Sequence, residues 1–331
     1  MTVPSFGFSV PQAAAFRDGE LAIDELAAFV RHAESLGFRD LVVADHILVP
    51  PNWARVIGDV FLDAFTLLAY LAAETDRLQL VLGCVVVPYR QPLSVAKAIA
   101  TLDQLSHGRA ALGVVPGYLQ AEFEALGVPF AERLTMTDEF IEIMRTVWTD
   151  EHATFAGRYH SFTDWNLKPK CVQQPHVPVW VGGASKGALE RAISVGDVWH
   201  PLGCVVISDE FMDAHRAEFA GETMQTDGMT PDRLRSALTA ARPFAEQRGR
   251  DLSSLEVVVM PGPPPASLEG AHSAIHSGTR ASRGGQEIVD WFADYVDAGA
   301  TGFVLGLAGS TLDACRASLE HVAAEVMPAF R

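Results

Sequence analysis

Two ionisable side chains stand side by side where an apolar run ends, in the stretch "FRDLVVADHILVPPNW" from Phe38 to Trp53. Asp45 and His46 directly follow the run from Leu41 to Ala44, and a proline-rich turn comes next. An imidazole gives or takes a proton near neutral pH, so the pair is a candidate for acid–base chemistry. In the competing interpretation Asp45 caps a turn and His46 is a structural histidine.

Three further strand ends carry candidate residues. In "LGCVVVPYRQP" the small side chain of Cys84 leaves space for a flat ring, unless Cys84 is an inert buried cysteine. In "VVPGYLQAEF" Gly117 permits a tight turn, and Tyr118 either offers a phenolic hydrogen or is a surface tyrosine. In "DVWHPLG" Trp199 and His200 come where the apolar part of the strand ends. They either form a wall of the site with a second imidazole or pack in the core.

A glycine-rich turn in "VWVGGASKGALERA" leads from a strand into a helix. Gly182 and Gly183 free the backbone, so that the N–H groups of Gly183, Ala184 and Ser185 can face an anion at the start of the helix. This pattern predicts a phosphate-binding turn, although many βα turns contain two glycines without binding phosphate.

Alternating strands and helices position these candidates. We expect strands at 5–10, 40–44, 78–87, 108–115, 177–183, 197–203, 255–260 and 301–307, and helices at 21–36, 62–73, 92–105, 120–126, 132–148, 186–195 and 311–326. Eight strands with helical connections predict an α/β fold of the (β/α)8 TIM-barrel class, whose active sites form where strands end. A doubly wound sheet is the main competitor, but no GxGxxG follows the first strand.

The chain shows no linker, so we expect one barrel domain over residues 1–331. The segment at 152–170 alternates and contains Gly157, which predicts a hairpin inserted between barrel units. Residues 261–285 are rich in Pro, Gly and Ser and predict a lid-like loop, and residues 219–229 are also loop-like.

The composition favours a protein that binds small molecules. The net charge is −16 and no Lys/Arg cluster occurs, which argues against nucleic acid or an anionic membrane as partner. No apolar run is long enough to span a membrane and no signal peptide is visible. The 4 cysteines lack CxxC spacing and the 11 histidines lack metal-binding spacing, so we expect no disulfide framework, no metal and a cytoplasmic location.

The inventory of side chains is poor in nucleophiles. A serine hydrolase would need a GxSxG elbow, which is absent, and a glycosidase would need two acids at strand ends, where only Asp45 qualifies clearly. Small residues around a polar mouth suit a bound cofactor that carries the chemistry.

Four stretches in this order resemble the luciferase-like monooxygenase superfamily: "LVVADH", "LGCVVVPYRQPLSVAKAIATLDQLSHGRAALGVVPGYLQAEFEALGVPFAER", "YHSFTDWNLKPKCVQQPHVPVWVGGAS" and "GDVWHP". The closest branch is the actinobacterial type assigned to the deazaflavin coenzyme F420. The resemblance runs from Phe6 to about Pro201 and resumes at "WFADYVDAGATGFVLGL".

The resemblance implies a barrel that binds a flavin-like ring at its carboxyl mouth. It implies a non-proline cis peptide at Cys84–Val85, so that Cys84, Val85 and Val86 back the ring together with Asp45 and Gly117. His46 takes the role of the acid/base that faces the reactive carbon. The turn from Gly182 to Ser185 takes the cofactor phosphate, and a homodimer is expected.

Departures from the family pattern bear on the cofactor and substrate. The sugar-phosphate dehydrogenases of the superfamily have a proton-donating glutamate where this chain has Tyr118, and their substrate-phosphate lysines find no match. The luciferases bind the flavin phosphate with an arginine where this chain has Pro116, which tilts the expected cofactor from FMN toward F420. Trp53 matches a tryptophan that forms a wall of the substrate pocket in the family. We expect Trp53, Trp199 and His200 to line this pocket.

The sequence therefore predicts an F420-dependent oxidoreductase that transfers a hydride between the coenzyme and a small organic substrate, with His46 managing the proton, Asp45 beside it, and Tyr118 in place of the glutamate. One alternative is an FMN-dependent monooxygenase of the same superfamily, in which reduced flavin activates oxygen. Another is a non-catalytic barrel that sequesters a flavin or a metabolite. The residues carry no readable code for the substrate.

Overall fold

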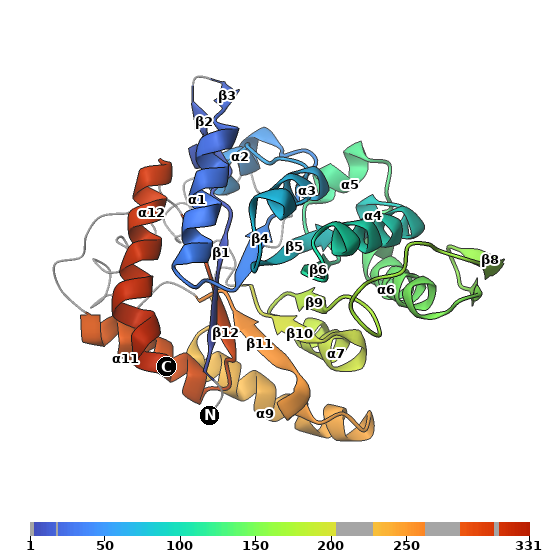
Figure 1. Ribbon diagram of the computed structural model, residues 1–331. Coiled ribbons are helices and arrows are strands. Elements are labelled where there is room, and N and C mark those ends of the chain that lie inside the picture. Colours follow the sequence, from blue (N-terminus) through green and yellow to red (C-terminus); the bar gives the residue numbers. More distant parts are fainter. Residues whose placement is uncertain (1–2, 18, 203–227, 262–284, 308–310) are drawn as a thin grey trace.

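Eight parallel strands close into a barrel, which confirms the predicted (β/α)8 class (Figure 1). The computed structural model describes residues 3–17, 19–202, 228–261, 285–307 and 311–331. Around the barrel the order is β1-β12-β11-β10-β9-β6-β5-β4, and β4 pairs with β1. The barrel strands are β1 (Ser5–Ser9), β4 (Asp40–Val43), β5 (Gln79–Val86), β6 (Ala110–Val115), β9 (Val179–Gly182), β10 (Val198–His200), β11 (Glu256–Val259) and β12 (Gly302–Leu305).

The helices expected from the apolar periodicity are all present within one to three residues of their predicted ends, except that the last one stops earlier. They are α1 (Ile23–Ser35), α3 (Ala64–Glu74), α4 (Pro92–Leu105), α5 (Gln120–Ala125), α6 (Arg133–Thr149), α7 (Lys186–Val195) and α12 (Leu312–His321). After His321 the chain continues as a π-helical turn over Val322–Val326. Gly37, just after α1, has a φ of +93°, a left-handed conformation that suits glycine at the end of a helix.

The structure adds elements that the sequence reading did not specify. These are the small hairpin β2 (Phe16–Arg17) and β3 (Glu20–Leu21), and the helices α2 (Pro51–Ile57), α9 (Pro231–Gln247) and α11 (Gly285–Asp297). The stretch read as a proline-rich turn forms α2, because a proline in the first turn of a helix removes no hydrogen bond and has a suitable φ.

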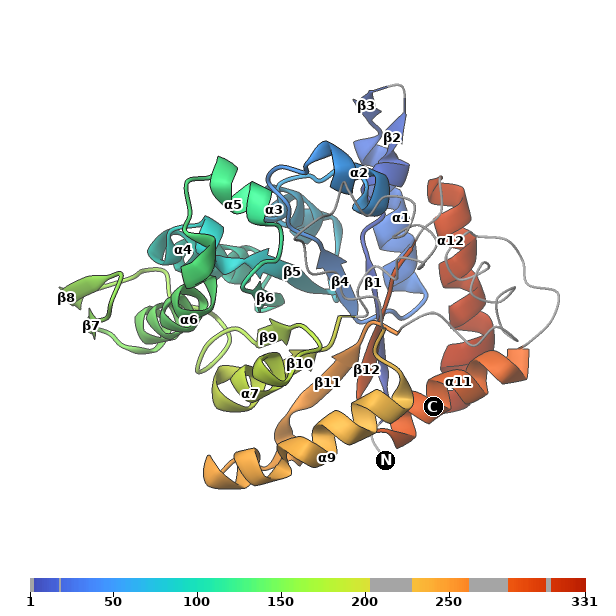
Figure 2. The same cartoon turned by 180° about the vertical axis from the view of Figure 1, so that it is seen from behind.

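The insertion predicted at 152–170 is a hairpin of β7 (Ala153–Ala156) and β8 (Ser161–Trp165), paired antiparallel. It projects away from the barrel in both views (Figures 1 and 2). Glu139 of α6 accepts hydrogen bonds from the backbone N–H groups of Arg158, Tyr159 and His160, so the turn of the hairpin is held against this helix. The lid-like loop predicted at 261–285 falls almost wholly outside the described residues.

The core has two parts because each strand buries both faces. Inside the barrel lie inward-facing side chains of seven strands: Val42, Val81, Ala111, Trp180, Val198, Val258 and Val304. A larger apolar cluster, with Leu41, Leu80 and Phe303 among its members, fills the space between the strands and the surrounding helices. None of the helices in the described part of the chain is both long and apolar enough to cross a membrane.

Candidate active site

Asp45 and His46 lie where β4 ends, at the carboxyl end of the barrel, on the side where α2 and α5 lie in both ribbon views. The Asp45 side chain is buried, and Arg90 donates to both of its oxygens: Nη1 to Oδ2 at 2.6 Å and Nη2 to Oδ1 at 2.7 Å. The Val86 N–H also donates to Oδ2 at 3.3 Å. Asp45 thus ties the end of β4 to the end of β5.

Burial raises the pKa of Asp45, although the neighbouring Arg90 guanidinium opposes this rise. Because both carboxylate oxygens are engaged, Asp45 is arranged to hold the two strand ends together. The sequence had singled out Asp45 but not Arg90, whose place two residues before the next helix carried no distinctive spacing.

His46 is oriented by a carboxylate from another element. Its Nδ1 lies 3.1 Å from Oε2 of Glu122 in α5. A carboxylate that lacks a proton only accepts hydrogen bonds, so Nδ1 carries the proton and, in the neutral imidazole, Nε2 has the lone pair. His46 therefore has the tautomer of an imidazole that can accept a proton through Nε2.

Glu122 is itself fixed by three other donors. Oε1 accepts from the backbone N–H groups of Ile47 at 2.7 Å and Leu48 at 3.0 Å, and Oε2 accepts from the Tyr89 hydroxyl at 3.0 Å. Burial alone would raise the pKa of Glu122, but the hydrogen bonds from His46 and the two amides outweigh it and hold the pKa below its ordinary value. Glu122 is therefore a buried, ionised carboxylate.

The sequence reading missed Glu122. The signal that could have revealed it is its helical spacing in "YLQAEF": Leu119, Glu122 and Phe123 share one face of α5, and all three are buried. An acid on an otherwise apolar helix face needs a partner, and here that partner is His46.

Aromatic rings surround the imidazole. Ring centroids of His46 and Phe61 are 4.7 Å apart, and those of His46 and Tyr118 are 6.1 Å apart, both edge to face. Tyr118 in turn contacts Trp53 at 5.3 Å. The structure thus brings together three of the predicted residues, His46, Tyr118 and Trp53, and adds Phe61.

The non-proline cis peptide is at Gly83–Cys84, one bond earlier than the predicted Cys84–Val85. The sequence could not fix the bond because glycine and cysteine are both small enough to stand at the bulge, where the pairing with β6 shifts register between Leu82 and Val85. Val85 is fully buried in the helix-facing core, whereas Val86 donates its N–H to Asp45.

The Cys84 thiol occupies space left by glycines on β6, the adjacent strand, and on β9, the strand beyond it. A Cβ on Gly182 would lie 2.6 Å from Sγ, and a Cβ on Gly113 would lie 3.1 Å from it. Burial raises the pKa of Cys84 to about 12, so it stays a neutral thiol and packs rather than reacts. Gly117 adopts a φ of +82°, a left-handed conformation that favours glycine.

The predicted phosphate turn is only partly available. The N–H of Gly183 donates to the His200 carbonyl at 3.0 Å, so it does not face an anion as expected. Ser185 is the N-cap of α7, where its Oγ accepts from the Ala188 N–H at 3.2 Å. The N–H groups of Ala184 and Ser185 make no hydrogen bond to any described residue, and Lys186 is exposed.

Trp199 and His200 are both fully buried, so neither forms an exposed wall. Trp199 faces the helix-side core, and its Nε1 donates to the Gly183 carbonyl at 2.9 Å. The two residues point to opposite faces because side chains alternate along a strand, and only His200 points into the barrel, against Trp180. Burial lowers the pKa of His200 to about 4.

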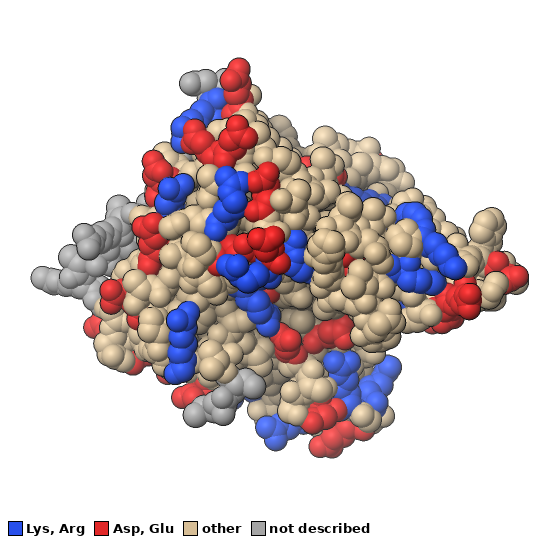
Figure 3. Space-filling view, in the orientation of Figure 1, with Lys and Arg blue, Asp and Glu red and all other residues tan. Residues whose placement is uncertain are grey.

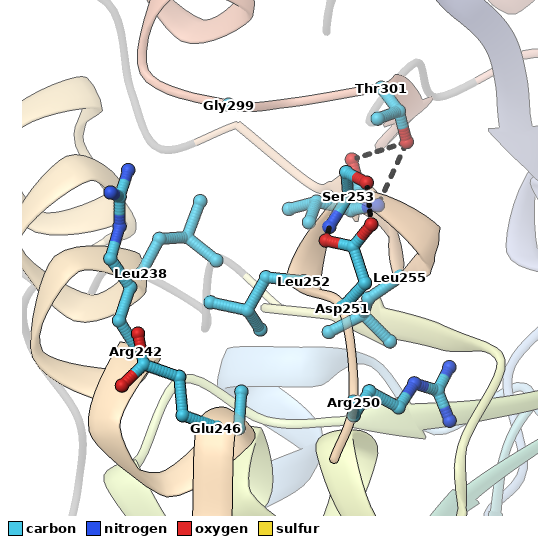
Figure 4. Close-up of a pocket in the computed structure, with 12 residues that line it drawn as sticks. Leu238, Arg242, Glu246, Arg250, Asp251, Leu252, Ser253, Leu255, Gly299 and Thr301 are labelled. Carbon is cyan, nitrogen blue, oxygen red and sulfur yellow. Dashed lines mark hydrogen bonds between the residues drawn. The ribbon is translucent and has the colours of Figure 1, made fainter.

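A cavity of about 560 Å³ lies far from this site, between α9 and the segments that precede β11 and β12 (Figure 4). Leu238 and Leu252 face one another across it, while Arg242 and Glu246 extend from α9. Its walls precede the strands, so it is at the amino end of the barrel, where active sites of this fold do not form. Among the described residues no group of three His, Cys, Asp or Glu is placed to hold a metal ion.

Comparison with known proteins shows the family of the chain. Residues 5–221 match the family model described as luciferase-like monooxygenase. The chain belongs to the luciferase-like monooxygenase family. The match includes the ends of β4, β5 and β9 and the whole of α5, which are the elements that carry the candidate site.

Relatives of this luciferase-like protein differ in their coenzymes. An FMNH2-dependent dimethylsulfone monooxygenase of Pseudomonas putida is 36% identical over 141 residues, which are 42% of this chain and 38% of that protein. A monooxygenase from Streptomyces bottropensis has a TM-score of 0.75 and 18% identity, covering 99% of this chain and 100% of its own. A coenzyme F420-dependent tetrahydromethanopterin reductase from Methanopyrus kandleri has a TM-score of 0.72 and 19% identity, covering 99% of both.

These two structures show that the fold is shared. The chain spans less than two thirds of the length of the curated relatives it matches first.

Proposed function

We propose that this luciferase-like protein is an F420-dependent oxidoreductase that transfers a hydride between the coenzyme and a small organic substrate. The observation that carries the proposal is the contact between His46 Nδ1 and Glu122, at the carboxyl end of a barrel of this family. It leaves Nε2 of the imidazole without a hydrogen-bond partner among the described residues.

The two side chains divide the proton chemistry. In the oxidation of an alcohol, the C–H hydrogen leaves with its electron pair and the O–H proton goes to Nε2 of His46. Glu122 keeps the imidazole in the required tautomer and stabilises the imidazolium that forms, because its carboxylate is already ionised. The bound coenzyme supplies the hydride acceptor. In the reverse direction the same atoms return the proton.

The residues present offer a partial cradle for such a coenzyme. The N–H groups of Ala184 and Ser185 precede a helix of ten residues, and Lys186 adds a positive charge, a set suited to a phosphate group. The bulge at Gly83–Cys84 is packed against glycines of β6 and β9, so it lines the end of the barrel with small groups, which suits a flat ring.

The choice of F420 over FMN rests on the resemblance and on Pro116, which stands where luciferases place a phosphate-binding arginine. Arg90, the described cation nearest to Asp45, donates to both oxygens of that carboxylate and is not available to replace it. FMN remains the second candidate, because the relative that is 36% identical is FMNH2-dependent.

Two titrations and one assay test the proposal. We expect saturable binding of F420, measured by its fluorescence, and weaker binding of FMN. Oxidised F420 with a panel of small alcohols, or reduced F420 with aldehydes, ketones and enones, should change the coenzyme absorbance. Tight FMN binding without F420 binding, with oxygen consumption by reduced FMN, would establish the monooxygenase instead. A His46→Ala variant with every activity and affinity intact would support a non-catalytic barrel.

A further inference from the structure

Two polar atoms inside the barrel, in rings that contact each other, are buried without a protein partner among the described residues. Trp180 of β9 and His200 of β10 are 1% and 0% exposed, and their rings meet edge to face with centroids 5.5 Å apart. Within the described part of the chain, neither Nε1 of Trp180 nor Nε2 of His200 has a hydrogen-bond partner. The pair is separate from the Glu122–His46 contact.

The two atoms have complementary roles. An indole Nε1 can only donate. Nδ1 of His200 lies 2.5 Å from the Val258 carbonyl oxygen, which can only accept, so Nδ1 carries the proton. Nε2 of the neutral ring is then an acceptor, and the lowered pKa of His200 keeps the ring neutral at ordinary pH. One buried donor and one buried acceptor thus belong to two rings that are in contact.

We propose that one water molecule is bound inside the barrel between these rings, accepting from Trp180 Nε1–H and donating to His200 Nε2. Leaving both atoms unpaired would cost the desolvation of each, and buried waters in proteins commonly bridge such groups. Water is the smallest molecule that donates and accepts at once, which suits a site between two fully buried rings.

The neighbours of the Trp180–His200 site indicate how water enters it and what the bound water stabilises. Trp180 also lines a cavity of about 360 Å³ at the amino end of the barrel, together with Asp197, Gln79 and Val198, so water reaches the indole from that end. The carbonyl of His200 accepts from the Gly183 N–H, so fixing the imidazole braces the turn that leads into α7. The bound water is therefore a structural support beneath the candidate coenzyme turn.

Nuclear magnetic resonance of the full-length protein tests the site directly. We expect the Trp180 indole N–H to show a cross-peak with bound water, and Nε2 of 15N-labelled His200 to show the chemical shift of an unprotonated, hydrogen-bonded nitrogen. Trp148 and Trp199 are matched controls, because their buried indoles donate to the carbonyls of Ala96 and Gly183 at 2.9 Å and should show no such cross-peak. A Trp180→Phe variant assigns the signal by removing it.

A crystal structure that resolves other buried waters gives a second, independent result. Density for one water within about 3.2 Å of both nitrogens would support the proposal. A dry gap, a direct bond of either nitrogen to a protein group, or a Trp180 indole as free of water contacts as that of Trp199 would overturn it. The crystal test does not depend on the folding of any variant.

Discussion

At the scale of single residues, the candidate site depends on a carboxylate that holds an imidazole. Glu122 accepts hydrogen bonds from the imidazole and from the amides of the two residues that follow it. Its contribution is geometric and electrostatic at once, because Oε1 fixes the loop after β4 while Oε2 sets the tautomer of His46. Replacing it tests the proposed chemistry without removing the imidazole.

Glu122→Gln should lower kcat on the order of 100-fold, because the amide can donate to Nδ1 and so favour the tautomer in which Nε2 is protonated. Coenzyme affinity should stay within a few-fold of the wild type. The control is Glu124→Gln in the same helix, an exposed residue whose loss should leave kcat unchanged. Equal effects of the two variants, or a His46 nitrogen spectrum unaltered by Glu122→Gln, would contradict the assigned role.

A second prediction concerns Gly182. A Cβ at this position would lie 2.6 Å from both Cys84 Sγ and Val115 Cγ1, so Gly182→Ala should destabilise the protein by about 1–3 kcal/mol through overpacking. Gly187→Ala is the matched control, since nothing lies within 4 Å of its added Cβ and alanine favours helix by up to about 1 kcal/mol. Thermal unfolding should move in opposite directions for the two variants, and a shift in the same direction would refute the packing argument.

At the scale of elements, buried carboxylates attach loops to helices. Glu34 of α1 accepts from the N–H groups of Asp76, Arg77 and Leu78 just before β5, and Asp103 of α4 accepts from those of Val172 and Gln173. Each acid is on a helix but orders a segment distant in sequence. The periodicity of the helices reveals their apolar faces, but not which acid will turn inward.

Glu34→Gln should lower the free energy of unfolding at pH 7 by about 1.5–3 kcal/mol, because it weakens three hydrogen bonds to a charged group. Burial would raise the pKa of Glu34, but these backbone hydrogen bonds outweigh it and hold the pKa below 4.5. The stabilisation is therefore present above that pH and is lost as the pH falls. Urea unfolding of the variant and wild type should converge in acid, whereas an exposed Glu25→Gln control on α1 should show little difference at any pH.

The sequence predicted the positions of strands and helices better than the side-chain contacts between them. All eight barrel strands lie inside their predicted ranges, because each is an apolar run bounded by polar or turn residues. The helix α2 was missed because its prolines resembled a turn, and the cis bond was displaced by one residue. Glu122 and Arg90 were missed because their partners, His46 and Asp45, are 76 and 45 residues away and are brought near only by the pairing of β4, β5 and β6.

At the scale of the whole molecule, the pH dependence of stability combines carboxyl groups whose pKa values are shifted in opposite directions. The net charge is −16, and acidic and basic side chains interleave on the face shown in Figure 3. Glu34 and Glu122 have lowered pKa values, whereas burial raises the pKa of Asp40 to about 6 despite the adjacent Arg39. The stability profile of the molecule is the sum of these contributions.

Asp40→Asn tests how the raised pKa of Asp40 affects the stability of the folded protein. The folded pKa of Asp40 is above its ordinary 3.8, so its contribution to stability is full below that pH and is lost as the pH rises through about 6. A shift of this size corresponds to about 3 kcal/mol. The difference in unfolding free energy between variant and wild type should therefore change between pH 4 and 7. The exposed Asp232→Asn should show no such change. A pH-independent difference for Asp40→Asn would disprove the titration.

The close fit of Cys84 against Gly182 also constrains the routes by which this barrel can evolve. A methyl group at 182 becomes tolerable only after the Cys84 sulfur and the Val115 methyl have both made room, so position 182 must change last. A library that randomises 84, 115 and 182 together should recover a larger residue at 182 only beside smaller residues at 84 and 115.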